Sequence, residues 1–162
     1  MGTPREAPLE PTVPARTAEL EAVRARRAEL RDAMGRLERS LAAPASGRAA
    51  VWAEQVHAVL VEMAADFDEH IEVTEGPGGL HQAILAGDLR LANAVNALAA
   101  EHSQIAAEID DLVAGSEAPA IQPDAEVVRD RGTNLLGRLV RHRQRGADLI
   151  YEAYQTDIGG GD

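Results

Sequence analysis

The sequence contains no cysteine and no lysine, and it has very few aromatic residues. The absence of cysteine excludes a disulfide framework, an iron–sulfur cluster and any thiolate zinc site. A metal ion in this chain would therefore need histidine and carboxylate ligands. Aromatic residues make up only 2% of the 162 residues, so the core must consist of Leu, Val, Ile and Ala, a mixture that suits closely packed helices.

Long apolar runs and a basic surface are missing as well. No segment reaches the roughly 18 to 20 apolar residues that a membrane-spanning helix needs, and the N-terminus lacks the apolar core of a secretory signal. The formal net charge of −11 argues against a nucleic-acid partner, because binding to phosphates needs a basic surface. We therefore expect a cytoplasmic protein with neither a membrane nor a nucleic acid as its partner.

Glycine and proline divide the chain into four long segments, in which apolar residues recur every three or four positions as in amphipathic helices. The segments cover residues 15–43, 47–74, 88–114 and 124–156, and a short helix over residues 80–86 can precede the third. Nothing in the chain resembles a strand. We predict one all-α domain over residues 15–156, an up-down-up-down four-helix bundle, between a disordered leader (1–14) and a flexible tail (157–162).

Three of the five histidines fall in the apolar stripe of a predicted helix. These are His70 in the second long segment, His102 in the third and His142 in the fourth. His57 lies about 140° around the helix from His70, and His81 lies in the Gly-rich connection. A single histidine on an apolar face is usually an ordinary core residue. Three together would leave six ring nitrogens to satisfy, at about 1–3 kcal/mol for each failure. Because neutral imidazole is a common ligand of iron and zinc, the pattern favours a metal site.

A metal site in a bundle core normally needs carboxylates too. Glu75 follows the histidine of its segment by five residues, and we expect the helix to end just after it, where the backbone can turn inward. Asp148 follows His142 by six residues, and a π-bulge between the two would bring it onto the same face. Spacing alone leaves each of these acids open between a metal ligand and a solvated side chain. Three other acids are expected on solvated faces: Glu69, Glu72 and Glu101.

With these residues the chain resembles the hemerythrin-like, HHE cation-binding proteins over roughly residues 15–156. The resemblance is carried by Asp68-Glu69-His70 with Thr74-Glu75, by Leu98 through Glu101-His102, and by Leu139 through His142 to Asp148. It implies a four-helix bundle that holds non-haem iron, as a di-iron centre or a single ion. The metal ligands that it implies are His70, Glu75, His102, His142 and Asp148. It also implies a small ligand (oxygen, nitric oxide or peroxide), or the sensing of iron.

The chain departs from the family pattern at several points. The family has a histidine on its first helix, and here Arg27 and Glu29 lie near that position. The third helix offers one histidine where the family usually has two, unless His81 folds back. Both carboxylate spacings are one residue longer than in the usual motifs. A mononuclear site, an unusual di-iron site and a member without metal remain as alternatives.

A metal-free helical module that docks a partner or self-associates is the alternative function. Arg27 in an apolar stripe is compatible with it, because such an arginine either pairs with a buried acid or marks a surface used by a partner. We favour a third interpretation, in which its side chain extends along the edge of the bundle to water. A hydrolase is not expected, since the chain has no nucleophile elbow, no HExxH motif and no Gly-rich phosphate loop after a strand, and an enzyme of another kind is the less favoured alternative.

Overall fold

The computed structural model describes residues 13–117 and 124–155, and every regular element within these residues is a helix. Four helices are long: α1 (Val13–Ala42), α2 (Ala49–Glu75), α4 (Ala92–Ser116) and α5 (Ala125–Gln155). The short α3 (Leu80–Gly87) and a 3-10 turn, η1 (Leu89–Leu91), connect α2 to α4. The predicted all-α class is confirmed. None of the described helices is both long and apolar enough to cross a membrane.

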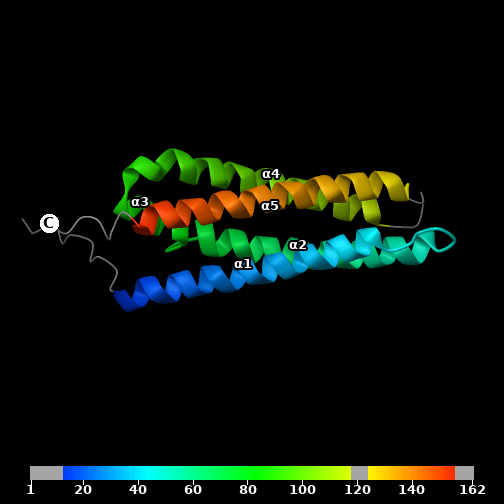
Figure 1. Cartoon of the computed structure of the whole chain (residues 1–162), viewed down its shortest axis with the longest axis horizontal. Helices are drawn as coiled ribbons and strands as arrows, with labels where there is room; N and C mark the ends of the chain where they lie inside the picture. The colour runs from blue at the N-terminus through cyan, green and yellow to red at the C-terminus, as the bar shows by residue number, and fades with distance from the viewer. Residues whose placement is uncertain (1–12, 118–123, 156–162) are drawn as a thin grey trace, which may run out of the picture.

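The four long helices lie side by side in one bundle (Figure 1). Helix α1 packs against α2 and α5, and α4 packs against the same two helices. Each long helix therefore has two long neighbours, and the inward stripes of all four meet along the middle of the bundle. This is the arrangement in which residues at the same depth on different helices can meet.

The helix bounds differ little from the predicted segments. Helix α1 begins at Val13, two residues before the predicted start of the domain, because Pro14 is compatible with the first turn of a helix, where its missing N–H is not needed. The short helix predicted over residues 80–86 is present as α3. The remainder of the predicted leader, residues 1–12, and the predicted tail, residues 157–162, lie outside the described residues.

The tight turn after α2 depends on two glycines. Gly78 has a φ of 73°, in the left-handed region that glycine adopts without strain. At Gly79 a Cβ would lie 2.8 Å from the carbonyl oxygens of Gly76 and Thr74, too close for any side chain. The turn folds α3 back against α2 and thereby carries His81 into the bundle, where it is buried.

The buried apolar side chains form two separate clusters along the bundle. The larger cluster includes Leu30, Phe67, Ile105 and Leu139, and the smaller includes Val23, Leu80, Leu98 and Leu149. On each long helix one polar residue lies between the two clusters: Arg27 on α1, His70 on α2, His102 on α4 and His142 on α5. We call these four residues the polar layer. Every long helix contributes one residue to it.

Candidate metal centre

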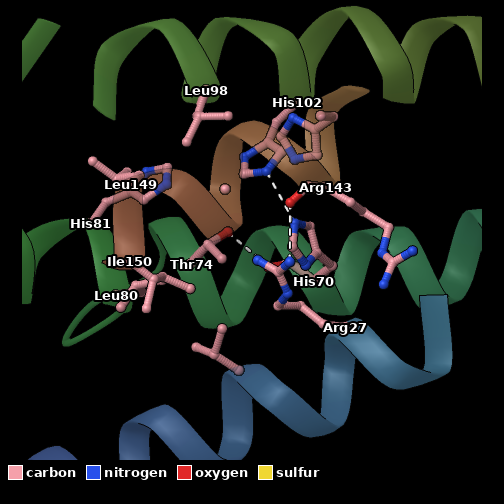
Figure 2. A pocket seen from close by; sticks show the side chains of 13 residues that line it. Arg27, His70, Thr74, Leu80, His81, Leu98, His102, Arg143, Leu149 and Ile150 are labelled. Atoms are coloured by element: carbon pink, nitrogen blue, oxygen red, sulfur yellow. Dashed lines mark hydrogen bonds between the residues drawn. The ribbon is translucent and has the colours of Figure 1, made fainter. Parts of the chain in front are cut away.

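The three histidines of the polar layer are buried and meet in the middle of the bundle, as Figure 2 shows for His70 and His102. The ring centroids of His70 and His102 are 5.0 Å apart, those of His102 and His142 are 4.6 Å apart, and those of His70 and His142 are 5.7 Å apart. One nitrogen of each ring lies within 4.8 Å of the chosen nitrogens of the other two. The predicted convergence is confirmed, and the three side chains lie close enough together to bind a metal ion.

Two carboxylates fix which ring nitrogens face the centre. Glu75 Oε1 contacts Nδ1 of His102, and Glu101 Oε2 lies 2.9 Å from Nδ1 of His142. A carboxylate beside Nδ1 favours the hydrogen on that nitrogen, which leaves the lone pair on Nε2. Nε2 of His102, on α4, faces the cluster and lies 3.2 Å from Nε2 of His70, on α2.

His70 is the ring whose hydrogen-bonding needs are not met within the described residues. Its Nδ1 atom is buried and has no hydrogen-bond partner there. If Nε2 of His102 carries a lone pair, the hydrogen between the two rings belongs to Nε2 of His70, and Nδ1 of His70 is a buried acceptor without a donor. An unsatisfied buried group of this kind costs about 1–3 kcal/mol. A cation at the centre would replace this single shared hydrogen and bind both lone pairs.

The environment keeps all three imidazoles neutral near pH 7. Burial and, to a smaller extent, the neighbouring imidazoles together lower the pKa of His70 to about 3. Burial, together with His142 and His81, also lowers the pKa of His102 to about 3. The pKa of His142 is lowered by burial, against the opposing effect of Glu101. A metal ion would therefore not have to displace protons from these rings. Three neutral imidazoles suit iron, zinc, copper or nickel.

Aromatic rings close the site on two sides. Phe67, which is fully buried, stacks on His70 with 5.7 Å between the centroids. It meets His102 edge-on at 5.8 Å and His142 at 6.3 Å. His81 of α3 stacks on His102, with 5.8 Å between the ring centroids and 6° between the planes. The sequence placed His81 in a connection, and the Gly-rich turn brings it to the cluster.

A small cavity adjoins the three imidazoles (Figure 2). Its other polar lining residues are Arg27, Arg143, His81 and Thr74, and its apolar lining includes Leu98 and Leu149. Its volume of ≈ 20 Å³ is enough for about one water molecule. The site therefore combines three imidazoles that can bind a metal ion with space for a very small ligand beside them.

Glu75 and Asp148 have different positions relative to the cluster. Glu75 ends α2, and its carboxylate contacts the outer nitrogen of His102. Asp148 lies on the exposed side of α5, where its Oδ1 accepts a hydrogen bond of 2.9 Å from Nε2 of Gln144. Helix α5 is a regular α-helix through this region, so the expected π-bulge is absent from it. Regular geometry holds Asp148 about 120° around the helix from His142, away from the cluster.

Glu101 is the site residue that the sequence interpretation missed. It was expected on a solvated face, and its carboxylate instead lies between Nδ1 of His142 and Nη2 of Arg145, the latter at 2.6 Å from Oε1. The reason is that the flank of α4 that carries Glu101 faces α5. Only the order of the helices around the bundle reveals this. Glu69 is exposed as expected, and it forms an ion pair with Arg26.

His57 takes no part in the cluster, as its position off the apolar stripe predicts. Its Nδ1 atom lies 3.0 Å from Oγ of Ser116 and 3.2 Å from the carbonyl oxygen of Val113. It is therefore a half-buried histidine that links α2 to α4 at a distance from the polar layer along both helices. This makes it a matched control for substitutions in the cluster.

No protein-family model matches the chain, and neither the curated proteins nor the solved structures include a significant match. Any assignment of a metal or a ligand must therefore rest on the residues of this chain.

Proposed function

We propose that this chain is a hemerythrin-like non-haem iron protein, which binds or senses a small ligand such as oxygen, nitric oxide or peroxide, or senses iron itself. The observation that supports this most strongly is the convergence of three buried, neutral imidazoles from three helices. Grouping polar rings in an apolar core costs stability unless their hydrogen-bonding capacity is used. An ion bound at the centre would use it.

The residues divide into ligands and supporting groups. Nε2 of His70, His102 and His142 would hold the ion. Glu75 and Glu101 would accept hydrogen bonds from the outer nitrogens of two of these rings, which fixes the ring orientation and raises the basicity of the inner nitrogen. When bound, iron supplies an open coordination position and one-electron chemistry.

We favour one ion over the di-iron centre that the family resemblance implies. The three imidazoles form a single group, with their chosen nitrogens all within 4.8 Å of one another. A second ion would need further donors, normally bridging carboxylates. Of the two acids that the sequence offers for this, Asp148 lies on the exposed side of α5, and Glu75 is engaged with His102.

Metal analysis of the purified protein tests this proposal. The chain should be stripped with a chelator and then offered ferrous iron without oxygen, with zinc and copper in parallel samples. We expect about one iron per chain and a visible spectrum that changes when nitric oxide is added. His102→Ala should abolish iron binding, whereas the matched His57→Ala variant should retain it.

Substoichiometric iron in the unmodified protein would contradict the proposal. If the melting temperature were also insensitive to every added metal and to alanine at all three histidines, the metal-free interaction module would be the better hypothesis. Stoichiometric binding of zinc but not of iron would support a metal site at the cluster and contradict the proposed iron chemistry.

A further inference from the structure

On the basis of the metal-binding function proposed for the cluster, we propose that the adjoining cavity is a site for a small anion, which the guanidinium of Arg27 binds next to the three imidazoles. This goes beyond metal binding, because it specifies the charge of the small ligand and assigns a role to the only member of the polar layer that is not a histidine.

Arg27 occupies the position on α1 that corresponds to the histidines on the other three long helices. Val23, one turn before it, belongs to the smaller apolar cluster, and Leu30, one turn after it, belongs to the larger. Arg27 lines the cavity together with the three imidazoles, and Figure 2 shows its side chain extending from α1 towards His70. The sequence interpretation that we favoured, a side chain that extends along the bundle edge to water, does not describe this inward position.

Helix α5 holds the guanidinium in this position. Nη2 of Arg27 donates a hydrogen bond of 3.0 Å to the carbonyl oxygen of Arg143. Close by, Gly146 leaves the space that Nη1 needs, since a Cβ at this position would lie only 3.3 Å from Nη1. The hydrogen bond uses one of the five N–H donors of the guanidinium, and the others remain available to a ligand.

The charge of Arg27 is not matched by a carboxylate. Among the described residues it forms no ion pair, although neighbouring arginines do: Arg26 pairs with Glu29 and Glu69, and Arg36 pairs with Glu62 and Asp66. The acids nearest the cluster are already engaged with histidines. Burial and the charge of Arg143 lower the pKa of Arg27, as expected for a cation without a counter-ion. A partly buried, unpaired charge is costly, and a bound anion offsets that cost.

A second arginine strengthens the positive potential in the cavity. Arg143 lines it as well, and its Nε atom is buried without a hydrogen-bond partner in the described residues. With two guanidinium groups and a bound cation on its walls, the cavity would attract anions, whereas a neutral diatomic would gain little from this charge. The volume of ≈ 20 Å³ has room for about one water molecule, so the ligand must be a very small anion of the kind that hydroperoxide and azide represent.

Binding of a charged and an uncharged probe to the iron-loaded protein tests the proposal. The probes are azide, titrated into the ferric protein, and nitric oxide, titrated into the ferrous protein, both followed by visible absorption. Arg27→Gln keeps a donor and removes the charge. We expect it to weaken azide binding about 10-fold or more, the value of one lost charge-assisted hydrogen bond, and to change nitric oxide binding by less than about 2-fold. Arg24→Gln, at an exposed position one turn earlier on α1, should change neither.

Thermal unfolding of the metal-free protein separates ligand binding from a structural role. Arg27→Met keeps the length of the side chain and removes its charge, so the melting temperature should stay the same or rise. A fall of several degrees, or azide affinity unchanged in Arg27→Gln, would overturn the anion site. Iron binding with unchanged azide affinity would overturn this inference alone, whereas failure to bind iron would overturn the proposed function together with it.

Discussion

Nε2 of His70 and Nε2 of His102 lie 3.2 Å apart, on two different helices and with almost no exposure to solvent. Two imidazoles at this distance share at most one hydrogen, so each limits the protonation of the other. Burial, with smaller contributions from neighbouring imidazoles, lowers the pKa of each to about 3. The pair therefore links the stability of the metal-free protein to pH and to metal.

We expect the metal-free protein to lose stability as the pH falls from about 6.5 towards 4. The pKa of His70 and that of His102 are about 3 in the folded protein and 6.5 for a free imidazole, so the unfolded chain binds protons in this range that the folded chain excludes. Each such proton lowers the free energy of unfolding by about 1.4 kcal/mol per pH unit. Above about pH 7 both states are neutral at these positions, and the effect vanishes. Urea denaturation at a series of pH values measures it.

The variant His70→Leu/His102→Leu serves as the control for this pH dependence. It retains the other titrating groups and removes the two imidazoles, so most of the loss of stability on the acid side should disappear. The same slope in the variant and in the unmodified protein would show that other groups cause the effect.

Metal should stabilise the protein through the same residues. At a free metal concentration about 100 times the dissociation constant, linkage raises the free energy of unfolding by about 2.7 kcal/mol, which corresponds to roughly 8 °C in the melting temperature. Calorimetry with and without ferrous iron measures the shift. His142→Ala should remove it, whereas His57→Ala should leave it in place. A similar shift in both variants would place the metal elsewhere.

Glu101→Gln should weaken metal binding by roughly 10- to 100-fold, because it removes the negative charge beside Nδ1 of His142 and makes Nε2 a poorer donor. Competition with a chromophoric chelator measures the affinity. Glu108→Gln is a matched control: it lies two turns further along α4, pairs with Arg138 at 2.6 Å, and has a side chain exposed to a similar degree, 21% against 20% for Glu101. Equal effects of the two substitutions would indicate a general electrostatic cause.

The sequence was sufficient to place the three central histidines. Helical periodicity reports which face of a helix a residue occupies, and His70, His102 and His142 each continue an apolar stripe, so their burial follows. Regular segments of similar length then made convergence at one depth a reasonable expectation. The same periodicity correctly set His57 apart.

The rest of the site depends on relations between helices that one-dimensional spacing does not contain. Glu101 touches His142 because α4 and α5 are neighbours, and Arg27 enters the polar layer because α1 packs at the matching height. His81 reaches the cluster through a glycine turn whose direction the sequence leaves open. Asp148 could join the cluster only through a π-bulge, a local distortion that spacing neither predicts nor excludes, and α5 keeps its regular geometry.

The contact between α1 and α5 should be sensitive to one added methyl group. At Gly132 a Cβ would lie 2.6 Å from Cδ1 of Leu41, a buried core residue, whereas at Gly137 on the same helix its nearest neighbour is Nη1 of Arg141, at 3.4 Å. Overpacking lowers the free energy of unfolding by about 1–3 kcal/mol, whereas the higher helix propensity of alanine over glycine raises it by up to about 1 kcal/mol. Gly132→Ala should therefore destabilise the protein by about 1 kcal/mol, and Gly137→Ala should stabilise it slightly.

Chemical denaturation of both variants gives the comparison directly. Stabilisation of similar size in both would mean that Leu41 moves aside at no cost, and that α1 and α5 are less closely packed than their contact indicates.

The division of the apolar interior by the polar layer also affects how the molecule fluctuates. The four long helices contribute to both apolar clusters, and the cluster that contains Val23 and Leu149 is the smaller. Its amide hydrogens should exchange with solvent sooner, because opening that end of the bundle leaves the larger cluster intact. An ion bound by histidines of α2, α4 and α5 would cross-link these helices between the two clusters. Local opening of one cluster would then require the other to open as well.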